Sequence, residues 1–241
     1  MPTILAHRGA SAYAPQNTMA AFRLAKRMRA DAIEIDIHMT ADQKLVVIHN
    51  DEIDEVSNGR GKVRDLTLEQ LKQFDFGSYM DRRFRGEKIP ELREVLQFVK
   101  DNNMQINIEI KHGDEAYPGM EAALAEELRR YGMLEDTVVS SFNTMSLRRI
   151  KSRCPTLKCA QLCLQANPEE VLKNCFDGVH PYFLSLTKEV VRACHSRGLF
   201  VNTWTVEEPE TILTLLAWDV DGIIKNKPDV AKKCVEAKTG K

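Results

Sequence analysis

The sequence lacks an excess of charge of either sign. Its 34 lysines and arginines stand against 35 aspartates and glutamates, which gives a formal net charge of −1. Proteins that bind nucleic acids or anionic membranes usually carry a basic surface, and this balance gives no reason to expect one. We therefore expect a small-molecule partner, with no nucleic acid and no stable membrane anchor.

Long apolar runs are missing as well. Charge already appears at residues 7 and 8 of the opening MPTILAHRG, so the amino end lacks the apolar core of a signal peptide. No run approaches the ~20 residues that a membrane-spanning helix needs. These absences favour a cytoplasmic protein and leave the oligomeric state open, with a homodimer as one option.

The six cysteines lack the spacing of a metal or redox motif. All of them lie in the carboxyl-terminal half, with no Cys-x-x-Cys pair and no histidine at zinc-finger spacing. We expect reduced and mostly buried thiols.

What the sequence does contain is a regular alternation of short β-rich runs with amphipathic helical stretches. The strands predicted to alternate with helices are 4–7, 32–37, 106–110, 137–141, 157–162, 178–183, 199–204 and 221–224. Such alternation indicates a parallel sheet with helices outside it. Eight strands in 241 residues favour a single closed (β/α)8 TIM barrel, one α/β domain over 1–241. An open doubly wound sheet is the alternative, but no Gly-rich dinucleotide turn follows any strand.

One further β-rich run, 45–49, does not fit the alternation. It follows 32–37 after a linker that is too short for a crossover helix and has the length of a hairpin loop. We therefore predict an antiparallel β-hairpin after the second strand. Folding the chain about 41–43 brings His49 back to the level of Glu34 and Asp36.

Residues 50–90 form a long polar excursion with one predicted helix at 66–74. Segments of this length between barrel elements are usually insertions or mobile loops. We expect a small insertion over the barrel mouth, with too few apolar residues for a core of its own.

Charged groups stand at the predicted carboxyl ends of several strands, where the catalytic residues of barrel enzymes gather. His7 and Arg8 end the first strand, and His49 ends the hairpin. Because strand side chains alternate, Glu34 and Asp36 share one side of their strand, and Glu109 and Lys111 share one side of theirs. Facing the barrel mouth, these strands would bring three carboxylates, two imidazoles, an arginine and a lysine together.

Crowded carboxylates repel one another unless a cation neutralises them. Oxygen ligands select a hard divalent ion such as Mg²⁺ or Ca²⁺. Arg8 and Lys111 suit a phosphate, and two histidines suit proton transfer to and from its oxygens. These parts describe metal-assisted cleavage of a phosphate ester. The alternatives are a purely structural strand-end histidine, and a Glu-x-Asp pair salt-bridged to Arg29 or Lys26.

The sequence resembles the glycerophosphodiester phosphodiesterase family, whose signature contains HRG, PENT, E-x-D and HD in this order. The chain carries HRG at 7–9, PQNT at 15–18, RADAIEIDI at 29–37 and VVIHND at 46–51. Further matches include IEIK, SSFN and DGIIKNKPD, so the resemblance runs from residue 4 to about 230.

This resemblance implies a barrel of the phospholipase-C-like type that hydrolyses glycerophosphodiesters to glycerol 3-phosphate and an alcohol. It implies that Glu34, Asp36 and Glu109 hold one divalent cation, Mg²⁺ or Ca²⁺. His7 and His49 would then be the acid–base pair.

The resemblance also assigns residues to the substrate. Arg8 and Lys111 would bind the phosphate. Phe142 and Trp204 match family positions that line the substrate pocket, with a place in the barrel core as the alternative.

The chain departs from the family pattern at three positions. Gln16 replaces the glutamate of PENT, Asn50 separates His49 from Asp51, and Glu55 stands where an arginine is common. We expect Gln16 to keep an amide hydrogen bond.

Three other functions remain open: a lyase that stops at a cyclic phosphate, an enzyme for lysophospholipids, and a non-catalytic barrel that binds phosphorylated ligands. A lipid substrate would call for an exposed apolar rim. For such a rim, segment 50–90 offers Phe74, Phe76, Tyr79, Met80 and Phe84.

Overall fold

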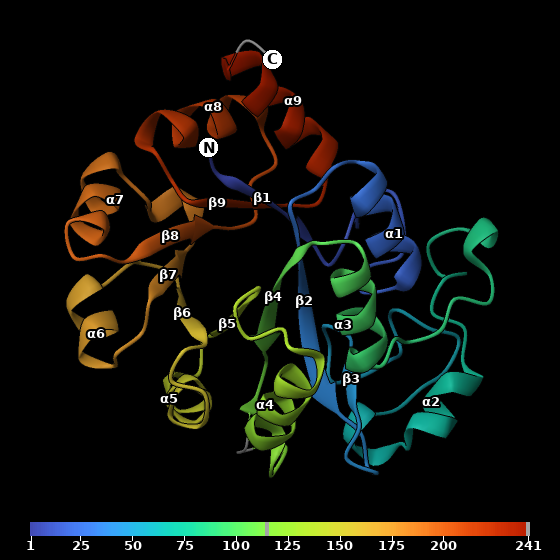
Figure 1. Ribbon diagram of the computed structural model, residues 1–241. Helices are drawn as coiled ribbons and strands as arrows, with labels where there is room; N and C mark the ends of the chain where they lie inside the picture. The colour runs from blue at the N-terminus through green and yellow to red at the C-terminus, as the bar shows by residue number, and fades with distance from the viewer. Residues whose placement is uncertain (114–115, 240–241) are drawn as a thin grey trace.

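The barrel closes at its first strand. In the computed structural model, which describes residues 1–113 and 116–239, β1 (Thr3–His7) pairs in parallel with both β2 (Ala32–Met39) and β9 (Gly222–Lys225). The remaining barrel strands are β4 (Gln105–Ile110), β5 (Thr137–Ser141), β6 (Lys158–Cys163), β7 (Gly178–Pro181) and β8 (Phe200–Thr203). Each pairs in parallel with its neighbours, so the predicted (β/α)8 barrel is confirmed (Figure 1).

Helices follow the barrel strands and lie outside them (Figure 1). The longer helices are α1 (Met19–Arg27), α3 (Leu92–Asp101), α4 (Met120–Tyr131), α5 (Thr144–Arg153), α7 (Lys188–His195), α8 (Pro209–Trp218) and α9 (Pro228–Thr239), and α6 (Pro168–Lys173) is shorter. In the described part of the chain, 3₁₀ turns lie at Val63–Asp65, Arg82–Phe84 and Phe183–Ser185.

The alternation within β2 explains where the charged groups go. Ile33, Ile35 and Ile37 are fully buried in the main core, which they share with residues of the outer helices. Successive strand side chains point to opposite faces, so Glu34 and Asp36 point into the barrel. The buried isoleucines on one face of β2 thus fix the position of the two carboxylates on its other face.

The predicted hairpin is present. β3 (Leu45–Val47) pairs antiparallel with the end of β2, with Ile37 opposite Val47 and Met39 opposite Leu45. Continuing this register places His49 opposite Ile35, between Glu34 and Asp36, at the level that the loop length predicts. The strand itself is shorter than the predicted 45–49, since the ladder assigned to β3 ends at Val47.

Residues 50–90 lie beside β3 and α3 at the edge of the barrel (Figure 1). The predicted helix is α2 (Leu68–Gln73). The expectation that this segment has no core of its own is wrong. A separate cluster of eight buried residues joins it to the hairpin: Val46, Ile48, Ile53, Val56, Val63, Leu71, Phe76 and Ile89.

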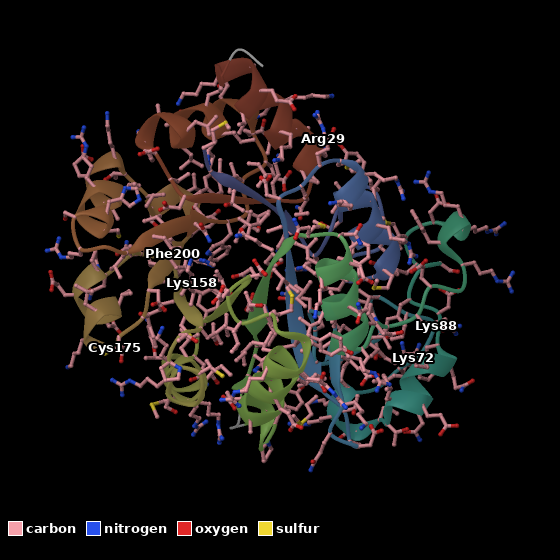
Figure 2. All side chains as sticks on the ribbon, viewed as in Figure 1. Arg29, Lys72, Lys88, Lys158, Cys175 and Phe200 are labelled. Carbon is pink, nitrogen blue, oxygen red and sulfur yellow. The ribbon has the colours of Figure 1, made fainter. Side chains whose placement is uncertain are left out.

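The organisation of residues 1–241 as one domain stays a prediction, and its last two residues lie outside the described part. Among the described residues, no helix is both long enough and apolar enough to cross a membrane. All six cysteines are free thiols, as expected, and three of them are buried. Cys175, labelled in Figure 2, is the exposed one.

Candidate active site

A cavity of about 170 Å³ opens at the carboxyl ends of the barrel strands. Eight of the predicted site residues line it: His7, Arg8, Glu34, His49, Glu109, Lys111, Phe142 and Trp204. At the amino ends of the strands lies another cavity, of about 380 Å³, next to Lys158 and Phe200 (Figure 2). The described residues that line it include no histidine, so the smaller cavity is the candidate active site.

Three carboxylates form an acidic cluster in this cavity. Oxygens of Glu34, Asp36 and Glu109 lie within 4.8 Å of one another, and all three side chains are buried. The strand register explains the cluster, because Asp36 of β2 stands beside Glu109 of β4. Glu34 stands beside His7 of β1 in the same way.

Burial and mutual repulsion shift the pKa values of the acidic cluster. Burial and the charges of Asp36 and Glu109 raise the pKa of Glu34 well above its ordinary value. Burial and Asp36 raise the pKa of Glu109 to about 7. Burial also acts on Asp36, but the Lys111 and Arg8 charges outweigh it and lower the pKa of Asp36 to about 2. Asp36 is therefore the member of the cluster that most favours its charged form.

The acidic cluster fits a divalent cation. Its donors are carboxylate oxygens alone, which is the ligand type that Mg²⁺ and Ca²⁺ prefer. Asp36 Oδ1 is buried and accepts no hydrogen bond among the described residues, although the Lys111 ammonium pairs with it at 3.4 Å. A bound cation would also favour the charged forms of Glu34 and Glu109.

Two fixed cations border the acidic cluster. Arg8 Nε lies 3.3 Å from Asp36 Oδ2, and Lys111 Nζ lies 3.4 Å from Asp36 Oδ1. Lys111 also pairs with Glu109 at 2.8 Å. Arg8 donates a hydrogen bond of 2.6 Å from Nη1 to Gln16 Oε1. The amide hydrogen bond expected of Gln16 is therefore present, and it orients the guanidinium toward the cavity.

The two predicted histidines face the same cavity, His7 from the end of β1 and His49 from two residues beyond β3. His7 Nε2 lies 3.9 Å from Glu34 Oε2. Burial and the Arg8 charge lower the pKa of His7 to about 4, and burial lowers the pKa of His49. Both shifts favour the neutral imidazole in the free protein. The Nδ1 atom of each ring contacts an asparagine, at 2.6 Å from Asn226 Oδ1 and 2.5 Å from Asn50 Oδ1.

The aromatic pair lies at the rim of the cavity. The rings of Phe142 and Trp204 meet edge to face, with centroids 5.7 Å apart. Trp204 Nε1 donates to His180 O at 2.7 Å, which fixes its indole. Phe142 is 52% exposed, so the barrel-core alternative is wrong for this residue.

Several site residues were not predicted from the sequence. Asn17 donates to Asp36 Oδ2 at 2.9 Å, and it belongs to the PQNT motif, which could have indicated it. Asn226 directly follows β9, and a polar residue at a strand end was the available signal. His38 contacts His49 O at 3.0 Å, and alternation on β2 places it on the side of Glu34 and Asp36.

The alternative in which Arg29 or Lys26 pairs with the Glu-x-Asp motif is wrong. Arg29 pairs instead with Glu236 of α9 at 2.8 Å. Lys26 donates to the carbonyl oxygen of Asn102.

A parallel barrel with charged groups gathered at the carboxyl ends of its strands has the architecture of a barrel enzyme. The chain belongs to the glycerophosphoryl diester phosphodiesterase family, whose model matches residues 7–230. It is 39% identical over 229 residues to a glycerophosphodiester phosphodiesterase of Caldanaerobacter subterraneus subsp. tengcongensis, with 94% of each chain covered. It is 35% identical over 252 residues to a glycerophosphodiester phosphodiesterase of Bacillus subtilis, covering 95% of this chain and 85% of that one.

Solved structures show the same barrel. A putative glycerophosphoryl diester phosphodiesterase from Silicibacter pomeroyi matches with a TM-score of 0.91 and 28% identity, covering 99% of this chain and 94% of that one. A phosphodiesterase from Oleispira antarctica, in complex with the product sn-glycerol-3-phosphate, matches with a TM-score of 0.92 and 25% identity. That match covers 98% of this chain and 97% of the other.

Proposed function

We propose that this protein hydrolyses glycerophosphodiesters to glycerol 3-phosphate and an alcohol, with one divalent cation, Mg²⁺ or Ca²⁺. The observation that carries the proposal is the convergence of the acidic cluster, two cationic side chains and two histidines on one cavity. The names of the two relatives and the product bound to the Oleispira antarctica enzyme support the substrate class.

Glu34, Asp36 and Glu109 would hold the cation. When bound there, a divalent ion would offset the negative charge that builds up on the phosphate. Arg8 and Lys111 lie on either side of Asp36, so both can reach a phosphate at the cluster. Their fixed charges favour a substrate with an anionic phosphodiester.

The histidines would move the protons. In the first step, the neighbouring glycerol hydroxyl attacks phosphorus and gives its proton to one imidazole. The bond from phosphorus to the leaving alcohol breaks, and the other histidine, in its protonated form, donates a proton to that alcohol. The resulting cyclic phosphate is opened by water with the two roles reversed, which releases glycerol 3-phosphate.

The primary test is release of glycerol 3-phosphate from glycerophosphocholine and glycerophosphoethanolamine, with Mg²⁺, Ca²⁺ or a chelator. We expect metal-dependent release that His7→Ala and His49→Ala each lower by a factor of about 10²–10⁴. His195→Ala is the matched control, because His195 lies at the end of α7 and pairs with Asp221 away from the cavity. No release with any ion would overturn the proposal and favour a non-catalytic phosphate-binding barrel.

A second candidate substrate class is the lysophospholipids, which carry the same phosphodiester with one acyl chain. Exposed apolar side chains follow β5, β6 and β7 at the cavity end of the barrel: Phe142 (52% exposed), Met145 (45%), Leu164 (65%) and Leu184 (72%). Of the residues that segment 50–90 offers, Phe74 and Phe76 pack into the cluster at the hairpin, whereas Tyr79 (41%) and Met80 (38%) are exposed. The exposed side chains after β5, β6 and β7 support this second candidate, because they would form the apolar rim that a lipid substrate calls for.

The lipid hypothesis predicts that loss of the apolar rim changes KM differently for two substrates that share one headgroup. Leu164→Ser combined with Leu184→Ser should raise KM for lysophosphatidylcholine and leave KM for glycerophosphocholine unchanged. An equal effect on both substrates, or no turnover of the lipid, would contradict this second candidate.

A further inference from the structure

Each of the two site histidines belongs to a His–Asn–Glu triad. In the first triad, His49 Nδ1 lies 2.5 Å from Asn50 Oδ1, and Asn50 Nδ2 donates to Glu55 Oε2 at 2.8 Å. All three residues lie within seven positions of the sequence, where the chain leaves β3. Two of them, Asn50 and Glu55, are departures from the family pattern.

The second triad is assembled from three different parts of the chain. His7 Nδ1 lies 2.6 Å from Asn226 Oδ1, and Asn226 Nδ2 donates to Glu207 Oε1 at 2.6 Å. Ser11 Oγ also lies within donating distance of Asn226 Oδ1, at 2.9 Å. The fully buried Lys225 anchors Glu207 by donating to its backbone oxygen and, at 3.3 Å, to its Oε2.

The glutamate determines which ring nitrogen carries the proton. A carboxylate only accepts hydrogen bonds, so the amide nitrogen of the asparagine must face the glutamate. The amide oxygen then faces the histidine, and the Nδ1 atom beside it must be the N–H group. In a neutral ring this leaves Nε2 with its lone pair free. For His7, that nitrogen is the one nearest to Glu34.

The other histidines whose side-chain contacts are known do not form a His–Asn–Glu triad. His38 contacts Tyr117 and His49 O, His180 contacts Asn202 through Nε2, and His195 contacts Asp221 through Nε2. Among the described histidines, only the two proposed to move protons pair Nδ1 with an asparagine whose amide faces a glutamate. The same atoms recur in the same roles although the residues come from unrelated segments.

We propose that Asn50 with Glu55, and Asn226 with Glu207, are positioning residues that hold His49 and His7 as Nδ1–H tautomers and present Nε2 to the substrate. The proposal rests on the proposed function, because that function gives both rings a proton to move. It goes beyond that function by assigning four further residues and the atom through which each histidine acts. An asparagine in this place orients the imidazole without placing a second carboxylate against it.

The direct test is tautomer analysis by long-range ¹H–¹⁵N correlation spectra of the whole protein, at a pH well above the ordinary histidine pKa of about 6.5. We expect Nδ1–H for His7 and His49 in the wild type. Asn50→Ala should convert His49 alone to a mixture of tautomers, and Asn226→Ala should do so for His7 alone. Each variant thus serves as the control for the other.

Kinetics supply a second readout. Each alanine variant should lower kcat by about 10- to 100-fold, by analogy with the loss of partners that orient metal-ligating histidines, with little change in KM. Asn174→Ala is the matched control. Asn174 follows α6 and also uses both ends of its side-chain amide, because Oδ1 accepts from Arg148 Nε and Nδ2 donates to the backbone oxygen of Glu170. This control should keep wild-type kcat.

A reciprocal exchange tests the orientation of the first triad. Asn50→Asp alone places two carboxylates in contact and should lower kcat. Adding Glu55→Gln restores a donor–acceptor pair with its direction reversed, and the carboxylate introduced beside the ring still accepts from His49 Nδ1. The double variant N50D/E55Q should therefore keep the Nδ1–H tautomer and recover most of kcat.

Three outcomes would overturn the inference. Unchanged tautomers in both alanine variants contradict the assignment even if the enzyme is active, and they leave the proposed function intact. Altered tautomers with unchanged kcat contradict the positioning role. If the wild type hydrolyses no glycerophosphodiester, the proposed function fails. Neither triad then has a catalytic role, whatever the spectra show.

Discussion

At the scale of single residues, Asp36 shows how a buried charge is held. Arg8, Lys111 and Asn17 all contact this one carboxylate, which is 1% exposed. A buried charge is tolerated only when partners replace its lost hydration. The three contacts keep Asp36 ionised while its neighbours in the acidic cluster are drawn toward protonation.

We expect Asp36→Asn to abolish metal-dependent activity. The substitution removes the charged ligand and leaves Arg8 and Lys111 facing an amide, so affinity for Mg²⁺ or Ca²⁺ should fall by more than the ~100-fold upper range for residues that only support ligands. Titration calorimetry and kcat measurements check this. Asp101→Asn, an exposed carboxylate at the end of α3, is the control. Full metal affinity in Asp36→Asn would contradict the assignment of the cluster.

His180 makes stability depend on pH. Complete burial lowers the pKa of His180 to about 3, whereas the unfolded chain has the ordinary value of about 6.5. At a pH below about 6.5, the histidine is protonated in the unfolded state but not in the folded state. Stability is therefore highest above this pH and declines as the pH falls toward the pKa of His180 in the folded state. Denaturant midpoints should therefore fall between about pH 7 and 5, and less steeply in His180→Gln. Equal slopes in the two proteins would contradict this explanation.

At the scale of elements, the loop from β1 to α1 carries Arg8 in a strained conformation. Arg8 has φ 54° and Gly9 has φ 79°, and the turn packs directly against α1. A Cβ atom on Gly9 would lie 2.7 Å from Ala21 Cβ and 2.8 Å from the backbone carbon of Ala21. The close approach of the loop to the helix sets the position of the Arg8 side chain.

Gly9→Ala should therefore destabilise the protein by about 1–3 kcal/mol and also lower kcat, because the loop must move away from α1. Gly132→Ala is the matched control: Gly132 also has a positive φ, 67°, but nothing lies within 4 Å of the point where an added Cβ would stand. It should lose stability through backbone strain of about 1–2 kcal/mol and keep its activity. Urea denaturation and steady-state kinetics separate the two effects. Wild-type kcat in Gly9→Ala would show that the loop position does not control the site.

At the scale of the whole molecule, barrel closure brings distant parts of the chain to one cavity. His7 and Asn226 are separated by 219 positions and lie 2.6 Å apart, because β1 pairs with β9. The cation site likewise joins β2 and β4. A ligand at the cavity would therefore tie several strands of the barrel together.

We expect Mg²⁺ or Ca²⁺ to raise the thermal midpoint. At a free concentration about 100 times Kd, binding to the folded state adds about 2.7 kcal/mol, or roughly 5 to 11 °C for a chain of this size. A calorimetric scan with each ion and with a chelator measures the shift. Glu34→Gln combined with Glu109→Gln should remove it. A shift that survives in the double variant would place the cation elsewhere.

Features that depend on residues close together in the chain were predictable from the sequence, whereas contacts between distant residues were not. The alternation of strands and helices, the side shared by Glu34 and Asp36, and the hairpin that returns His49 all follow from residues close together in the chain. Periodicity and loop length suffice for such features, because each residue's neighbours set its side and direction. The small core of segment 50–90 was missed since its members are scattered singly among charged residues.

The sequence by itself determined the barrel, the charged groups at its strand ends and the family resemblance. Only the tertiary structure decided which atoms meet. Asn226, which Glu207 orients, reaches His7 because the barrel closes, and no local pattern encodes a contact across 219 positions. The tautomer of each histidine is likewise decided by an amide whose orientation depends on a glutamate beyond it. Hydrogen-bond direction is a property of the assembled group, so it exists only once the chain has folded.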